Sequence, residues 1–364
     1  MTIKILRTVP LLVIALGPTG CTRPKPDGEL ASRIDAYLSE AVPESGFQGS
    51  ISVALSGSVL FSASYGMANL EHQVPNTLRT RFRIGSVTKQ MTATGLLILQ
   101  DQGRLDVEDR VLEYLPDLPP TWAGITIHQM LTHTSGLPDL TDLPNWKERV
   151  SSPSTLGEEA FWYWEEPLLF QPGQEFRYSN AGYELAGLII ERVSGAPYEA
   201  FLQETVFEPL GLLETGFDRR DRIIPNMAQG YFIEESEKRP APEFHEASGG
   251  STYSTVGDMI RWGHALSTGE LLSQAALEGL TTPEVRTDST GTITAYASGL
   301  FVREINGTRT LSHGGWVPGY NAFVLVAPEK EICVVALSNV TYTAFSPPAI
   351  SARIANEVAS IVLE

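Results

Sequence analysis

Hydrophobic and polar residues alternate with a period of two in two separate parts of the chain. Near the N-terminus, residues 50–56 and 59–65 show this alternation on either side of a Gly57-Ser58 pair, which predicts a β-hairpin. Near the C-terminus, the same pattern predicts four further strands, at 298–305, 308–313, 321–327 and 332–338. The short connections between these segments favour an antiparallel sheet.

The last of these strands is apolar on both alternating faces, which is typical of a central strand with helices packed on each side. Helical periods at about 30–41 and 348–363 predict two helices that supply this cover. From about 86 to 246 helical spacing and Pro/Gly-rich loops dominate, which predicts a mainly helical lobe inserted into the sheet. The expected fold is α+β, an antiparallel β-sheet flanked by helices with this inserted lobe.

The N-terminus has the three regions of a signal peptide. Lys4 and Arg7 precede an apolar run at 9–16, and the small residues Thr19 and Gly20 stand before Cys21. Residues 1–21 are therefore interpreted as a signal peptide, 22–29 as a tether and 30–364 as the folded domain. The apolar run is short for a transmembrane helix. The signal-peptide pattern predicts that the folded domain is exported.

Cys21 resembles the lipidated cysteine of a bacterial lipoprotein, although Pro18 stands where that motif usually has leucine. Lipidation at Cys21 would anchor the protein to the membrane of a bacterial cell envelope. Ordinary cleavage nearby, which would release it into the periplasm, and an uncleaved anchor are the alternatives.

The net charge of −17 makes nucleic acid an unsuitable partner, because its phosphates would be repelled. No H-E-x-x-H, P-loop or G-x-G-x-x-G spacing occurs, so neither a metal nor a cofactor is expected. The oligomeric state is left open.

Three short motifs follow one another along the chain: Ser86-Val87-Thr88-Lys89, Tyr178-Ser179-Asn180 and His313-Gly314-Gly315. Each is a weak signal alone. However, only Tyr178 among 12 tyrosines has Asn two positions later, and only His313 among 6 histidines precedes two glycines. Their conjunction indicates a hydrolase that forms an acyl-serine intermediate.

Ser86 and Lys89 are expected on one face at the start of an amphipathic helix. A serine hydroxyl needs a base within hydrogen-bond reach, which Lys89 can be, and a helix N-terminus favours negative charge at Ser86. Tyr178 could ionise beside a cation and take the serine proton.

Glycines after His313 allow close approach of the backbone to a ligand. The N–H groups of Ser86 and Trp316 are expected to form an oxyanion hole. His313, with Gly314 and Gly315, is expected to bind substrate, polarising the carbonyl region or binding a carboxylate.

Together with LTHTSGLP at 131–138 and ASGGSTYST at 247–255, the motifs resemble the serine β-lactamase and penicillin-binding-protein superfamily, above all its class C branch. The resemblance implies that Ser86 is acylated with Lys89 as its partner, that Tyr178 is the general base and that Asn180 bonds Lys89 or the substrate amide. His133, in the first stretch, is interpreted as structural.

His313 stands where most class C β-lactamases carry a lysine, and this lowers the expectation of an efficient β-lactamase. We therefore expect small-molecule or peptide acyl substrates, namely esters or D-amino-acid-containing peptides. The alternatives are a β-lactamase and a lipoprotein that binds penicillin or peptidoglycan without turnover.

Overall fold

The computed structural model describes residues 28–219, 222–234, 237–244, 252–283, 285–286, 295–342 and 350–364. The signal peptide, the candidate lipidation site Cys21, most of the tether and the first part of the 247–255 stretch lie outside the described residues.

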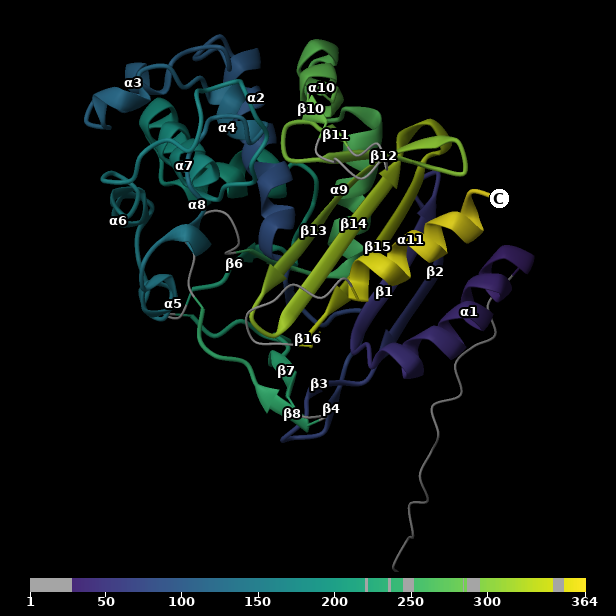
Figure 1. Ribbon diagram of the computed structural model, residues 1–364. Helices are drawn as coiled ribbons and strands as arrows, with labels where there is room; N and C mark the ends of the chain where they lie inside the picture. The colour runs from purple at the N-terminus through teal and green to yellow at the C-terminus, as the bar shows by residue number, and fades with distance from the viewer. Residues whose placement is uncertain are drawn as a thin grey trace, which may run out of the picture.

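An antiparallel sheet forms the centre of the molecule (Figure 1). Among the described residues, eight strands build it in the order β10-β11-β12-β13-β14-β15-β1-β2. Their bounds are β1 (Gly49–Leu55), β2 (Ser58–Tyr65), β10 (Val285–Arg286), β11 (Ala295–Tyr296), β12 (Phe301–Ile305), β13 (Thr308–Val317), β14 (Tyr320–Ala327) and β15 (Ile332–Ser338). The α+β class with its antiparallel sheet is confirmed, because period-two alternation reports directly which side chains face the core.

Helices cover both faces of the sheet. On one face α1 (Glu29–Ser45) packs beside α11 (Ile350–Val362), where residues such as Leu38 and Val358 are fully buried against Val334 of β15. On the other face lies α9 (Val256–Thr268), which contacts β1, β14 and β15 (Figure 1). The two terminal helices therefore share one face. Our expectation that these two helices cover both faces of the sheet is wrong. The sequence pattern shows that both faces of β15 are buried, but it does not show which helix buries each face.

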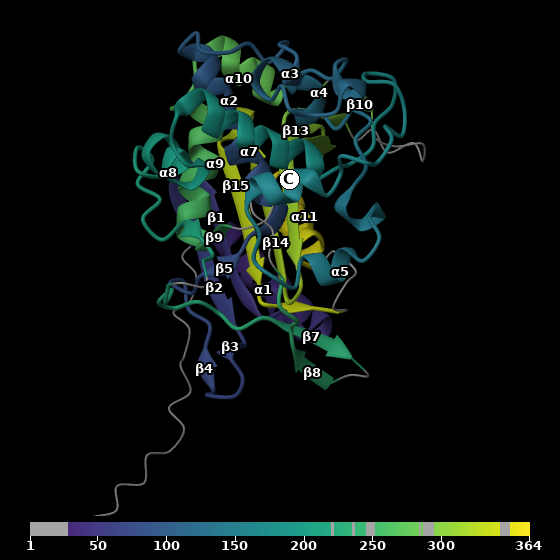
Figure 2. The same cartoon turned by 90° about the vertical axis from the view of Figure 1, so that its left-hand side faces the viewer.

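The helical lobe packs beside the sheet, with α2 (Thr88–Asp101) and α7 (Ala181–Ser194) in contact at its centre (Figure 2). Ser86 lies in a 3₁₀ turn, η1 (Gly85–Val87), that leads directly into α2. The other helices are α3 (Val111–Tyr114), α4 (Ile127–Leu131), α5 (Trp146–Arg149), α6 (Leu156–Phe161), α8 (Tyr198–Leu202) and α10 (Gln274–Thr281). Among the described residues of this lobe, the last helical element is the π-helical turn Gln203–Phe207.

Short strands occupy much of the remainder: β3 (Met67–Asn69), β4 (Val74–Pro75), β5 (Phe82–Arg83), β6 (Gly216–Phe217), β7 (Tyr231–Glu234), β8 (Glu237–Pro240), β9 (Thr252–Ser254) and β16 (Val340–Thr341). Of these, β5 matters for the site, because it delivers the chain to η1 and is held in a small sheet by β9. In the part of the chain that the structure describes, no helix is both long and apolar enough to cross a membrane.

Candidate active site

Ser86 lies where the lobe meets the sheet, and the turn that carries it is firmly anchored. Ile84 and Val87, on either side, are fully buried, whereas Ser86 itself is partly exposed. Gly85 has φ +52°, a left-handed conformation that favours glycine. The turn therefore presents the hydroxyl of Ser86 to solvent from a rigid base.

Lys89 is fully buried within one turn of Ser86. Its Nζ lies 3.1 Å from Ser86 Oγ and 2.6 Å from Asn180 Oδ1. The ring centroids of Tyr178 and Tyr183 are 5.2 Å and 5.4 Å from the same nitrogen. The amide oxygen and the two aromatic faces offset part of the cost of burying a cation. The structure thus brings the predicted serine, lysine and asparagine into direct contact.

The Tyr178-Ser179-Asn180 motif is fixed by backbone and side-chain bonds to the loop that follows α4. The backbone N–H of Asn180 donates to Asp139 Oδ1 at 2.8 Å, and Ser179 Oγ donates to the carbonyl of Pro138 at 2.8 Å. These contacts hold Asn180 where its side chain reaches Lys89. Asp139 was not identified from the sequence, because an isolated aspartate in a loop carries no distinguishing pattern.

The hydroxyl of Tyr178 hydrogen-bonds Ser86 and Lys89. Even so, the pKa of Tyr178 is raised above its ordinary value, because burial of the phenol outweighs the attraction of Lys89 and these hydrogen bonds. We expected a neighbouring cation to lower this pKa. The correction follows from burial, which the sequence does not report, and it leaves Tyr178 as a neutral phenol in the resting site.

Strand β13 brings the third motif against η1, the turn that carries Ser86. A Cβ atom on Gly315 would lie 1.7 Å from the carbonyl oxygen of Ile84 and 3.2 Å from Ser86 N. A Cβ atom on Gly85 would lie 2.7 Å from Trp316 N. Only glycines permit this approach. It places the backbone nitrogens of Ser86 and Trp316 on facing segments, which is the arrangement that the predicted oxyanion hole requires.

His313 is buried, and both of its ring nitrogens have partners inside the protein. Nε2 lies 3.0 Å from the hydroxyl of Tyr296, and Nδ1 lies 2.6 Å from the carbonyl oxygen of Gly314. Burial, together with the charge of Lys89, lowers the pKa of His313 to about 3. A neutral imidazole with both nitrogens engaged does not bind a carboxylate, so this geometry contradicts that expected role of His313.

Two further residues complete the surroundings of His313: His133, which the sequence analysis interpreted as structural, and Tyr296, which it did not identify. The hydroxyl of Tyr296 also contacts His133 Nε2 at 3.1 Å, and His133 Nδ1 accepts the N–H of Ser179 at 3.2 Å. His133 lies in the LTHTSGLP stretch, which contributes to the family resemblance but does not indicate the hydrogen-bond partners of His133. Tyr296 lies 163 residues after His133 in the sequence, and no motif marks it.

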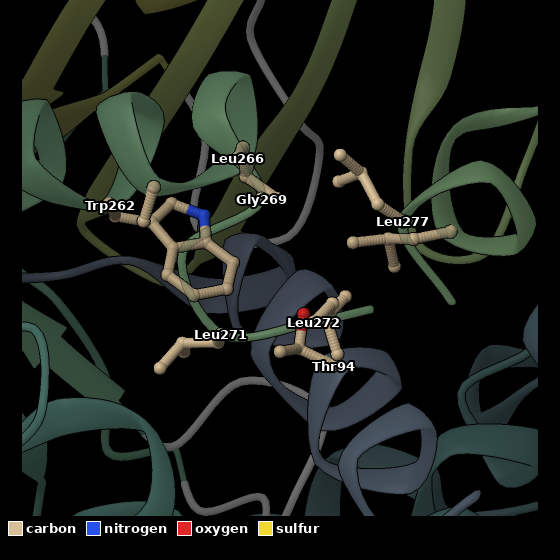
Figure 3. A pocket seen from close by; sticks show the side chains of 9 residues that line it. Thr94, Trp262, Leu266, Gly269, Leu271, Leu272 and Leu277 are labelled. Carbon is tan, nitrogen blue, oxygen red and sulfur yellow. The ribbon is translucent and has the colours of Figure 1, made fainter. Parts of the chain in front are cut away.

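A separate apolar pocket lies between α2, α9 and α10 (Figure 3). Its lining combines the hydroxyl of Thr94 with Trp262 and a set of aliphatic side chains that includes Leu266, Leu272 and Leu277. The indole N–H of Trp262 is already used, donating to Gln90 Oε1 at 2.6 Å. This pocket offers shape but no reactive group. Among the described residues, no three or more His, Cys, Asp or Glu side chains are grouped so as to hold a metal ion.

Comparison with known proteins indicates the same family as the motifs. Residues 34–359 match the family model described as Beta-lactamase. The chain is 30% identical over 313 residues to Penicillin-binding protein 4* of Bacillus subtilis strain 168, an alignment that covers 80% of this chain and 68% of that protein.

Solved structures agree at the level of the fold. D-amino acid amidase from Ochrobactrum anthropi SV3 superposes with a TM-score of 0.81 at 27% identity, covering 92% of this chain and 98% of the amidase. The hydrolase EstCE1 superposes with a TM-score of 0.78 at 25% identity, covering 91% and 98%. The resemblance inferred from the motifs is confirmed: the chain belongs to the Beta-lactamase family and is a serine hydrolase of that family.

Proposed function

We propose that this protein hydrolyses esters, amides of D-amino acids, or D-peptides through an acyl intermediate on Ser86. The observation that carries the proposal is the contact of Ser86 Oγ with the buried amine of Lys89, at 3.1 Å, beside the backbone nitrogens of Ser86 and Trp316. A hydroxyl, a base and two facing N–H groups are the parts that acyl transfer needs.

In the acylation step, Lys89, a buried cation at rest, first releases its ammonium proton to solvent. Ser86 Oγ then attacks the carbonyl carbon of the substrate, and the hydroxyl proton of Ser86 passes to the neutral amine of Lys89. The tetrahedral oxyanion accepts hydrogen bonds from the N–H groups of Ser86 and Trp316. Tyr178, hydrogen-bonded to both Ser86 and Lys89, relays the proton to the departing alcohol or amine. We assign Tyr178 this relay because its raised pKa keeps the phenol protonated at rest.

In the deacylation step, water attacks the acyl carbon, its proton passes through Tyr178 and Lys89, and Ser86 Oγ leaves with a proton. The same hydrogen bonds serve both steps in reverse order. Asn180 keeps Lys89 directed at Ser86 through its 2.6 Å bond.

Within this proposal, the neutral state of His313 favours uncharged esters and amides over substrates that carry a carboxylate, whether β-lactams or peptides with a free C-terminus. β-Lactams carry a carboxylate, and a permanent cation recognises a carboxylate far better than a neutral imidazole whose nitrogens are both engaged. The charge of −17 further disfavours anionic substrates. Structural neighbours named as a D-amino acid amidase and a hydrolase with acyltransferase activity are consistent with ester and amide chemistry.

The test is turnover of four substrates: p-nitrophenyl acetate, D-phenylalanine amide, a D-alanyl-D-alanine peptide and a chromogenic cephalosporin. Ser86→Ala should abolish all activity, and mass spectrometry should find the acyl group on Ser86. Ser39→Ala, on the exposed face of α1, is the matched control and should change nothing. Fast cephalosporin turnover would identify a β-lactamase instead, and penicillin binding without any turnover would identify a binding protein.

The N-terminal sequence supports a second part of the proposal, which is export with a lipid anchor on Cys21. Metabolic labelling with palmitate in the native host should mark the wild-type protein and not Cys21→Ser. An unlabelled wild-type protein found in a soluble periplasmic fraction would show cleavage without lipidation.

A further inference from the structure

His133 has an unusual backbone for a histidine. It follows α4 with φ +56°, in the left-handed region that costs a non-glycine residue free energy. In this conformation its N–H donates to the carbonyl of Met130 at 3.2 Å, and its own carbonyl accepts the N–H of Arg177 at 2.9 Å. The turn directs the imidazole under the Tyr178-Ser179-Asn180 motif, where it is fully enclosed.

The partners of both histidines determine where the protons lie. His133 Nδ1 accepts the backbone N–H of Ser179, so the neutral ring carries its proton on Nε2 and donates to the hydroxyl oxygen of Tyr296. The carbonyl of Gly314 can only accept, so His313 carries its proton on Nδ1 and its Nε2 accepts the hydroxyl proton of Tyr296. One continuous chain of hydrogen bonds therefore runs from Ser179 to Gly314.

Both histidines of this chain lie beside Tyr178. The ring of His133 lies against that of Tyr178, with centroids 4.2 Å apart, and the ring of Tyr178 is 6.2 Å from that of His313. Tyr178 in turn bonds Ser86 and Lys89. The second and third motifs, which are distant in the sequence, are thus connected through two side chains that neither motif contains.

We infer that His133 and Tyr296 are positioning residues of the Ser86 site: they hold the Tyr178 ring in place, and the Tyr296 hydroxyl keeps His313 Nε2 occupied as an acceptor. This inference rests on the proposed acyl transfer at Ser86 for its effect on rate. In this left-handed conformation one ring bonds Ser179, lies against Tyr178 and reaches Tyr296.

The fixed tautomer has an electrostatic consequence. The titratable or charged groups that face His313 are Lys89 of α2, Tyr178 of the second motif, His133 beyond α4, and Tyr296 of β11. A second cation at His313 would oppose protonation of Lys89, which has to take up the proton of Ser86. Because the Tyr296 hydroxyl donates to His313 Nε2, it occupies the position at which a second proton would bind to His313.

The test compares Tyr296→Phe and His133→Asn with the wild type. Phenylalanine keeps the ring of Tyr296 and removes both of its bonds to histidine. Asparagine tolerates a left-handed backbone and keeps an acceptor for Ser179, but it does not reach Tyr296. Tyr198→Phe is the matched control, because Tyr198 is equally buried and its hydroxyl bonds Thr92 at 2.7 Å, away from the site residues.

Three measurements separate positioning from general stability: the melting temperature, the tautomer of His313 by ¹⁵N-detected NMR, and the pH profile of kcat/KM on p-nitrophenyl acetate. We expect Tyr296→Phe to melt like Tyr198→Phe and to lose about tenfold to a hundredfold in kcat with little change in KM. The ¹⁵N shift of His313 Nε2 should change, because that nitrogen loses its donor while Gly314 still holds the proton on Nδ1, and any acidic limb of the profile should move to higher pH. His133→Asn should lower kcat in the same direction.

The outcomes separate this inference from the proposed function. If the wild type acylates Ser86 and both variants do so at wild-type rates, the positioning role is refuted while the proposed function stands. If the wild type does not acylate Ser86 at all, the proposed function fails, and the effect on rate fails with it. The NMR measurement then still decides the hydrogen-bond chain, because an Nε2–H form of His313 in the wild type would overturn it without any substrate.

Discussion

Gly315→Ala tests the close approach of β13 to η1, the turn that carries Ser86. The new Cβ would lie 1.7 Å from the carbonyl oxygen of Ile84. A carbon–oxygen contact needs about 3.3 Å, so the two segments would have to separate by about 1.6 Å. This displacement would move the N–H of Trp316 away from that of Ser86. A misplacement of about 1 Å costs about a hundredfold in rate, and loss of an oxyanion donor costs about a hundredfold to a thousandfold.

The assay is steady-state hydrolysis of p-nitrophenyl acetate, combined with thermal unfolding. We expect kcat of Gly315→Ala to fall about a hundredfold to a thousandfold while most of the protein stays folded at the assay temperature. Gly314→Ala is the matched control on the opposite face of the same strand, where the new Cβ would lie 3.4 Å from the Phe323 ring, an ordinary contact. It should keep kcat within about threefold.

Two results would refute this reasoning. If Gly315→Ala retained kcat within threefold of the wild type, the approach of β13 would not set the rate. If Gly314→Ala lost as much activity as Gly315→Ala, the loss would come from general damage to the strand and not from the oxyanion hole.

Three further predictions concern the polar groups of the site. Lys89→Met should lower kcat about a hundredfold to ten-thousandfold, because the base in contact with Ser86 is lost; activity that persisted at high pH would assign the base to Tyr178 instead. Asn180→Ala should lower kcat about tenfold to a hundredfold through the lost 2.6 Å bond to Lys89, and an unchanged kcat would show that Lys89 is held by other contacts. The folded-state pKa of His313, about 3, lies below the ordinary value near 6.5, so the unfolded chain binds more protons between these limits and stability falls as the pH falls through this window. Unfolding by denaturant at pH 7 and pH 4 should therefore show a smaller loss for His313→Gln than for the wild type, and equal losses would contradict the lowered pKa.

The sheet could be predicted because burial on alternate faces is written into the order of residues. Strands 332–338 and 321–327 were placed within a residue of their observed bounds for this reason. Which helix covers which face depends on the path of the chain, and the period of α1 and α11 gives no information on it.

Part of the geometry of the candidate site was predictable from the sequence, but its charge states were not. The spacing of Ser86 and Lys89 fixes their contact, because both lie within one helical turn. The protonation of Tyr178 and His313 depends on burial by segments far away in the sequence. Tyr296 contributes a hydroxyl from β11, and no local pattern could show that it bonds His313.

The packing of the molecule indicates a preformed site. One continuous hydrophobic cluster contains Leu96 of α2 and Ile189 of α7 in the lobe, and also Val324 of β14 and Val335 of β15 in the sheet. Close-packed interiors resist displacement, so lobe and sheet do not move independently around Ser86 at small cost. The separation of Ser86 from Trp316 is therefore set by the folded core before substrate arrives, and in the proposed acyl transfer the oxyanion is stabilised without rearrangement of these segments.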